Sequence, residues 1–292
     1  MEINDILQAF EIYDKEYKRQ AINAAIARRE EIIPELIGVL ENVLKNPAHY
    51  ADRDCHYFAH VYAFMLLGYF KEARAHDVIV DLAGLPGDLP SDLFGDSITG
   101  DLPIVLLGTC GGRIDRIKEL ILNKDAYEYC RGSALQALSY AVVEGYTTRE
   151  EVLSFYQGLF TGNEALAPSC FHDVLAICIH DLYPEELMDT IKKAYEEGLI
   201  HPGYVGYGEF SEVLKAGREK CLKKLREQVE EKQIKNIHEY MDWWACFRQP
   251  GKTLPDISSA NTPNNKQKQE NKTKKTKKKQ SKQSKKANRK KK

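Results

Sequence analysis

Two histidines and a cysteine stand close together in the segment CHYFAH, and all three are residue types that bind zinc. On a helix, His56 and His60 would share one face because they are four residues apart, with Cys55 beside them. A structural zinc site needs four ligands, and the sequence offers no second pair at a ligating spacing. The segment also lacks the glutamate of an HExxH motif. We therefore interpret the histidines as core or interface residues and predict neither a metal nor a cofactor.

Cys110 lies in the segment GTCGG, where the flanking glycines could expose a thiolate at the start of a helix. No histidine or aspartate stands at a telling distance, so a small residue at a tight turn between paired helices is the simpler interpretation. No other part of the sequence assembles a nucleophile, a base and an oxyanion donor. We therefore predict no catalytic residue, and keep an enzyme with an unrecognised site as an alternative.

Four aspartates, Asp88, Asp92, Asp96 and Asp101, occupy the longest internal connection, residues 87–101. The spacing of an EF-hand is absent, and aspartates among glycines and prolines usually form turns and cap helices. An ordered connection of this length nevertheless often binds a ligand. We therefore name these aspartates, with Arg131 and the neighbouring helix starts, as a possible binding surface.

Trp243 and Trp244 are adjacent and are the only tryptophans. On a helix they would point about 100° apart, so both cannot face one narrow core stripe. Burial of a terminal helix on two sides is the favoured interpretation, because large apolar residues usually close cores. An exposed aromatic anchor for a partner is the alternative, and both residues belong to the possible binding surface.

Helical periodicity runs through the chain up to about residue 250, and strand alternation appears nowhere convincingly. The closing apolar residues of successive first helices, Leu67, Leu107, Leu138 and Ile177, recur at intervals of 40, 31 and 39 residues. A short connector and a second apolar stripe follow each of them. A period near 40 with two helices per unit is typical of HEAT-like repeats. The predicted fold is therefore all-α, a HEAT-like solenoid of antiparallel helix pairs with a disordered C-terminal tail.

Residues 209–247 are expected to cap the C-terminal end of this solenoid, because they combine a charged face with an apolar one. Seven positions at core spacing are expected to be buried: Ala63, Leu66, Leu67, Leu135, Leu138, Leu175 and Ile191.

The charge is divided sharply along the chain. Residues 261–292 hold 15 lysines and arginines against one acid, so the preceding 260 residues carry a net charge of −15. The tail has no residue able to form a core, and such segments stay disordered. We therefore divide the chain into a helical-repeat domain, residues 1–247, and a disordered Lys-rich tail, residues 248–292. The residues expected to contact polyanions are Lys274, Lys275, Lys277, Lys278, Lys279, Lys285, Lys286, Arg289, Lys290, Lys291 and Lys292.

No membrane span is expected, because the longest apolar stretch, residues 61–70, is too short to cross a bilayer. The N-terminus lacks the basic and apolar regions of a secretory signal. The cysteine count is odd, at seven, and no CxxC pair occurs, which favours free thiols in a reducing compartment. The predicted location is the cytoplasm.

Four segments, among them YDKEYKRQAINAAIARREEIIPELIGVLENV, YFAHVYAFMLLGYFKEARA and DWWACF, together resemble the bacterial family called domain of unknown function 1186. The resemblance spans roughly residues 13–247 and implies a helical-repeat fold without an established activity. Some members of that family end in a zinc-binding SEC-C motif built from clustered cysteines. No cysteine follows Cys246 in this chain, so the zinc role is not implied here.

The leading hypothesis for function is a non-catalytic binding scaffold, because solenoids offer long surfaces for a protein or peptide partner. A nucleic-acid or ribosome-associated protein that binds through its basic tail is the main alternative.

The tail is expected to bind RNA or duplex DNA, and the body is not. Fifteen flexible cations neutralise phosphates and release counterions, so binding should weaken steeply as salt rises. The measurement compares the whole chain with a chain that ends at Ala260, at low and moderate salt. Equal binding by both chains, or binding that ignores salt, would show that the tail is not the contact; no binding by either would leave it a solubility tail.

Overall fold

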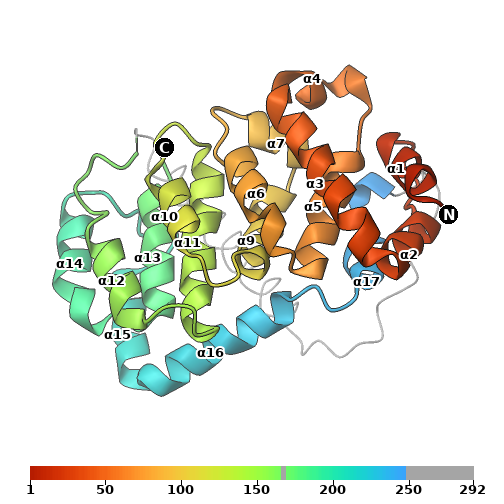
Figure 1. Ribbon diagram of the computed structural model, residues 1–292. Helices are drawn as coiled ribbons and strands as arrows, with labels where there is room; N and C mark the ends of the chain where they lie inside the picture. Colours follow the sequence, from red (N-terminus) through yellow and green to blue (C-terminus); the bar gives the residue numbers. More distant parts are fainter. Residues whose placement is uncertain (166–168, 248–292) are drawn as a thin grey trace, which may run out of the picture. The chain divides into compact units, whose positions relative to one another are not determined.

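Helices account for nearly all of the regular structure in this computed structural model, which describes residues 1–165 and 169–247 (Figure 1). Within those residues no strand forms, and only two isolated bridges join Ile12 to Tyr57 and Pro86 to Ala126. The prediction of an all-α fold is confirmed. The Lys-rich tail and its predicted polyanion contacts lie outside the described residues.

The helices of the N-terminal half are α1 (Ile3–Glu11), α2 (Arg19–Ala27), α3 (Arg29–Lys45), α4 (Pro47–Ala51), α5 (Ala59–Phe70), α6 (His76–Ala83), α7 (Leu89–Phe94), α8 (Ser97–Gly100) and α9 (Leu102–Thr109). Those that follow are α10 (Asp115–Leu122), α11 (Glu128–Val143), α12 (Arg149–Gln157), α13 (Phe171–Asp181), α14 (Met188–Glu196), α15 (Tyr207–Ala216), α16 (Arg218–Lys232) and α17 (Ile237–Met241). Short 3-10 turns are η1 (Arg53–Cys55), η2 (Ala73–Ala75), η3 (Glu185–Leu187) and η4 (Ala245–Phe247).

The apolar residues whose spacing marked successive first helices all lie in helices that pack on one another. Leu67, Leu107, Leu138 and Ile177 lie in α5, α9, α11 and α13, which pack on one another in that order. α6, α10, α12 and α14 follow them along the chain, but only α12 packs closely on the helix before it, whereas α6 packs on α3 and α10 packs on α11. All seven positions predicted to be buried are inaccessible to solvent, which places the core between the two rows.

Close packing of the first helices depends on a glycine. A Cβ atom at Gly68 of α5 would stand 2.7 Å from Cγ2 of Val105 in α9. Only a residue without a side chain lets the two helices approach this closely. Because α5 is almost wholly apolar and buried on all sides, it forms the centre of the N-terminal half.

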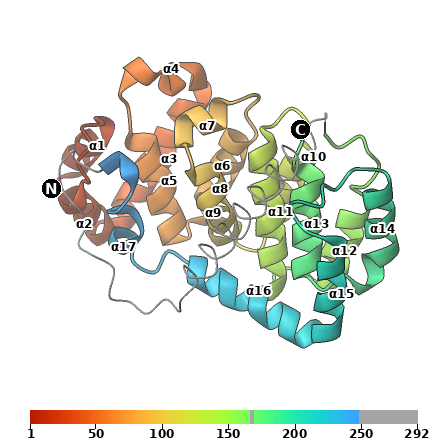
Figure 2. The same cartoon turned by 180° about the vertical axis from the view of Figure 1, so that it is seen from behind.

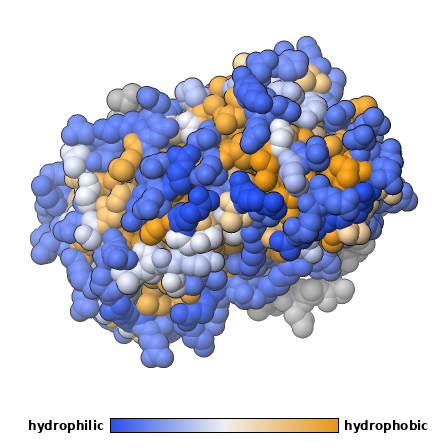
Figure 3. Space-filling model, in the orientation of Figure 1, coloured by the Kyte–Doolittle hydropathy of each residue, from blue (hydrophilic) through white to orange (hydrophobic). Residues whose placement is uncertain are grey.

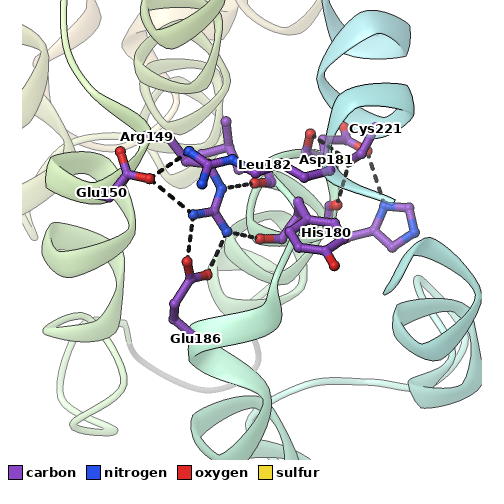
Figure 4. Close-up of polar contacts among 9 residues, drawn as sticks. Arg149, Glu150, His180, Asp181, Leu182, Glu186 and Cys221 are labelled. Carbon is purple, nitrogen blue, oxygen red and sulfur yellow. Dashed lines mark hydrogen bonds and ion pairs between the residues drawn. The ribbon is translucent and has the colours of Figure 1, made fainter. Parts of the chain in front are cut away.

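A buried arginine joins the last two helix pairs (Figure 4). Arg149, at the start of α12, donates from Nε to the carbonyl oxygen of Leu182 at 2.5 Å and also donates to the carbonyl of Tyr183. These carbonyls follow the end of α13, where no intrahelical donor remains for them. Glu186 accepts from Nη1 of Arg149 at 2.7 Å, and this contact lowers the pKa of the Glu186 carboxyl. From the other side, the thiol of Cys221 in α16 donates to the carbonyl of Asp181 at 3.2 Å.

Residues 209–247 cap the C-terminal end only in part: α15 packs on α14 there, but α16 and α17 leave that end, contrary to the sequence-based expectation. After α15 the chain turns back, and α16 packs on α13 and α11 toward the N-terminal helices, where α17 contacts α5 (Figures 1 and 2). The reason is physical: α16 buries only Leu225 and Val229, whereas Ile237 and Met241 need an apolar partner of their own. The first helices near the N-terminus supply it.

The outer face is mainly hydrophilic. Figure 3 shows charged and polar residues over most of the face seen in Figure 1, with hydrophobic side chains in strips over the N-terminal helices. Figure 2 shows the molecule from behind, where α16 runs from α15 toward α17.

Candidate functional site

Residues 233–247, which we call the C-terminal strap, are held to the N-terminal helices by polar contacts. The ring of His238 lies between Tyr17 and Asn23, with 2.9 Å from Nδ1 to the Tyr17 hydroxyl and 2.8 Å from Nε2 to Oδ1 of Asn23. Because an amide oxygen only accepts, Nε2 carries the proton and Nδ1 accepts from the tyrosine. Burial and the nearby Arg19 guanidinium lower the pKa of His238 and keep the ring neutral. Arg19 also pairs with Asp242 of the strap at 2.6 Å.

An aromatic cluster fixes the end of the strap. The ring of Phe247 lies 5.3 Å from Tyr17, 5.9 Å from Phe58 and 5.9 Å from Tyr62, measured between ring centroids. Trp244 stacks on the same phenylalanine at 6.2 Å. Aromatic pairs at these separations stabilise beyond the area that they bury. The strap thus docks through both hydrogen bonds and packed rings.

A third contact joins the middle of the strap to the start of α9. The hydroxyl of Tyr240 donates to Oδ1 of Asp101 at 2.8 Å. Asp101 is 8% exposed, and its burial raises the pKa of its carboxyl. A buried carboxyl needs such donors to offset the loss of hydration. This bond therefore sets the spacing between the strap and residues 91–101.

A groove of about 950 Å³ opens between these two parts of the chain. One wall comes from the strap and the end of α16, and the other from α7, α8 and the residues around them. Phe58 and Val61 contribute from the start of α5. The groove is lined by Phe58, Val61, residues 91–97, Gly100, Asp101, residues 231–233, Lys235, Asn236, Glu239, Tyr240 and residues 243–246.

The groove is acidic and aromatic at once. Five carboxylates and two lysines line it, a formal charge of −3. Among the described residues, the exposed carboxylates of Asp92 and Asp96 make no hydrogen bond or ion pair. Lys235, by contrast, already pairs with Glu230 at 2.6 Å, and the charge of Lys232 acts on the buried carboxyl of Asp101. The unpaired charge of the groove is therefore negative.

Five of the seven residues predicted as a binding surface meet in this groove: Asp92, Asp96, Asp101, Trp243 and Trp244. Asp88 lies outside it. The connection that carries the aspartates is not a loop, since it folds into the short helices α7 and α8. Asp88, Asp96 and Asp101 occupy the N-cap positions of α7, α8 and α9, where the sequence predicted capping residues. None of their side chains accepts a hydrogen bond from the backbone of the helix that follows.

Arg131 is a core residue and not part of a surface. It is 3% exposed, and its guanidinium donates to the carbonyls of Ile121 at 2.9 Å and Glu164 at 2.8 Å. The guanidinium also stands 4.1 Å from the ring centroid of Phe171. Its position in the sequence gave no sign of this, because the partners lie in other helices and connections.

The tryptophans do not share a helix. α17 ends at Met241, so Trp243 and Trp244 lie in the turn before η4. Trp243 is 60% exposed, whereas Trp244 is half-buried against Phe247. The burial of both in a cap helix, which the sequence favoured, is therefore wrong for Trp243.

The candidates for metal binding and catalysis are separated or buried. α5 begins at Ala59, so His56 precedes the helix in a left-handed conformation and shares no helix face with His60. Among the described residues no group of three or more potential ligands could hold a metal ion. Cys110 is fully buried, its thiol donates to the carbonyl of Leu107 at 3.2 Å, and burial raises the pKa of this thiol.

Tyr240 was missed by sequence analysis, although it connects the two walls. The sequence gave one local sign of its role: Tyr240 lies three residues before Trp243, in a segment that is more apolar than the polar outer face of a terminal helix. The arrangement as a whole can bind, because it combines an aromatic surface with carboxylates at fixed positions. Among the described residues that line it there is no histidine to act as a general base.

Within the described part of the chain, no helix has both the length and the apolar character needed to cross a bilayer. A family model described as "Protein of unknown function (DUF1186)" matches residues 1–248. An uncharacterized protein of Chlamydia trachomatis is 31% identical over 246 residues, which cover 84% of this chain and 96% of the relative. An uncharacterized protein of Chlamydia muridarum is 32% identical over 215 residues, covering 73% and 85%. No solved structure matches the chain.

Acid should destabilise the fold through His60. Nε2 of this buried ring donates to the carbonyl of Leu93 at 2.7 Å, and burial lowers the pKa of His60 to about 4. A histidine kept neutral by folding stabilises fully above its ordinary pKa of 6.5, and this contribution is lost as the pH falls toward 4. His60→Gln should reduce the pH dependence of the free energy of unfolding in this window by about 1 kcal/mol per pH unit.

Urea unfolding at several pH values measures this effect. The matched control is His201→Gln, which makes the same substitution at an exposed histidine. Parallel curves for His60→Gln and the natural sequence would contradict the assignment.

Proposed function

We propose that this chain, which belongs to the DUF1186 family, is a non-catalytic helical-repeat binding protein that holds a segment of a protein partner in the groove beneath its C-terminal strap. The observation that carries the proposal is the meeting of three distant parts of the chain in one groove, with Asp92, Asp96 and Trp243 at its surface.

The size and lining of the groove support binding. Ligand sites commonly enclose roughly 300–1,000 Å³ and combine apolar surface with a few placed polar groups. Tryptophan and tyrosine are the residue types that most often dominate binding energy at protein interfaces. Trp243, Trp244 and Tyr240 all line this groove.

The chemistry of the lining argues against covalent catalysis. Cys246 is the one thiol among the described lining residues, and burial raises its pKa to about 11. A thiol rather than a thiolate therefore stands there near neutral pH, and the thiol is the weaker nucleophile. The carboxyl of Asp101 is engaged by Tyr240.

A HEAT-like relationship supports a scaffold, since the helix pairs repeat at intervals near 40 residues. The seven cysteines are free and support a reducing compartment, so we place the protein in the cytoplasm. A second candidate function, nucleic-acid binding, rests on the 15 basic residues of the tail.

A photocrosslinking amino acid at position 243 tests the proposed site. The matched control carries it in place of Tyr204, because Trp243 and Tyr204 are both 60% exposed and Tyr204 does not line the groove. In a native lysate the label at 243 should give a discrete protein adduct that the label at 204 does not give. Peptide mapping of the adduct should place the crosslink within one short segment of the partner.

Two outcomes would contradict the proposal. Equal adducts from both positions would mean that exposure alone decides crosslinking. Labelling at 204 without labelling at 243 would move the binding surface away from the groove.

A further inference from the structure

We infer that the occupant of the groove is a basic segment of a partner protein, an extended peptide whose lysine or arginine side chains enter between the acidic wall at α7 and α8 and the tryptophans of the strap. This inference rests on the proposed function and adds the chemistry of the ligand.

Charge complementarity is the first argument. The groove carries a formal charge of −3, and its unpaired carboxylates, Asp92 and Asp96, stand four residues apart on one wall. Lys235 is neutralised by Glu230. An acidic peptide or a nucleic acid would meet repulsion here, whereas a cationic segment would be attracted and steered toward the groove.

The aromatic wall is the second argument, and it is independent of the first. A lysine ammonium or an arginine guanidinium is attracted to the face of an aromatic ring, and tryptophan is the strongest of these rings. Trp243 and Trp244 of the strap line the same groove as Asp92 and Asp96. A cationic side chain can thus contact an indole while its charge stays near a carboxylate, and its methylene stem buries apolar surface.

The dimensions favour a peptide over an inorganic cation. The groove encloses about 950 Å³, far more than an ion needs. Within the described residues no three potential metal ligands come together. Lysine and arginine side chains on an extended backbone fill such a space with both apolar and charged surface, and alternate residues of the peptide can point into it.

The hydrogen bond between Asp101 and Tyr240 fixes the position of the strap. The buried carboxyl of Asp101 accepts from Tyr240, so the position of the strap wall relative to the acidic wall is set before a ligand arrives. A preformed groove loses less conformational entropy on binding than a groove that must first close.

Tryptophan fluorescence tests the inference on the whole chain. Trp243 and Trp244 are the only tryptophans, so a change in emission reports events at the groove without a label. The probe is a short peptide of alternating lysine and glycine, and its control replaces each lysine with glutamine. The lysine peptide should change the emission saturably, more weakly at higher salt, and the glutamine peptide should not.

Matched variants separate the groove from general charge. Asp92→Asn combined with Asp96→Asn should weaken binding of the lysine peptide about tenfold or more, which corresponds to about 1.4 kcal/mol. Asp88→Asn combined with Asp125→Asn removes the same charge from exposed positions outside the groove and should change affinity little. Circular dichroism of both pairs checks that the helices are retained.

Four results would overturn the inference. Equal effects of the two double variants would show non-specific attraction. An equal response to the glutamine peptide would show that the groove binds peptides regardless of charge, which leaves the proposed function standing. No response to either peptide would exclude basic segments as ligands, and photocrosslinking from position 243 would still decide the proposed function. Binding that appears only after the lysines of residues 261–292 are changed to glutamine would identify the chain itself, and not a partner, as the source of the basic segment.

Discussion

The contact between His238 and Tyr17 joins residues 221 positions apart, and the groove depends on it. A contact at such separation orders a long stretch of chain, so it persists only if several groups support it. Here the ring of His238 has a partner at each nitrogen, Phe247 packs among the aromatic rings of the N-terminal half, and Tyr240 bonds to Asp101. If the strap left the body, the groove would lose an entire wall. The groove is therefore a product of the return of the chain.

This constraint also limits the surface that the packed helices leave uncovered. A row of helix pairs normally presents one long face, but here α16 of the same chain packs on α11 and α13. Leu225 and Val229 bury their side chains in that contact. The groove is lined by residues of the strap and by residues of α7 and α8. A groove of limited length with acidic and aromatic walls suits one segment of a partner better than a whole folded surface.

Local patterns in the sequence predicted what depends on neighbouring residues. Leu67, Leu107, Leu138 and Ile177 marked four successive first helices, because each lies in an apolar face of helical period. α7 and α8, with six and four residues, are too short to show a period, and the glycines around them indicated a loop. The return of α16 could not be predicted, since its amphipathic stripe fits any apolar partner. The burial of Arg131 was missed for the same reason: its bonds are made to carbonyls outside its own helix. The sequence thus brought out five of the residues that line the groove, without showing why they meet.

The most direct test of this account is a double-mutant cycle between the strap and the N-terminal helices. Tyr17→Phe, His238→Phe and the double variant are unfolded in urea, and their free energies of unfolding are compared with that of the natural sequence. If the strap returns as described, the two changes are coupled by about 1 kcal/mol, because either one already removes the bond. Effects that add within about 0.3 kcal/mol would mean that the two residues do not touch. That result would contradict the docking of the strap, and with it the groove and its proposed ligand.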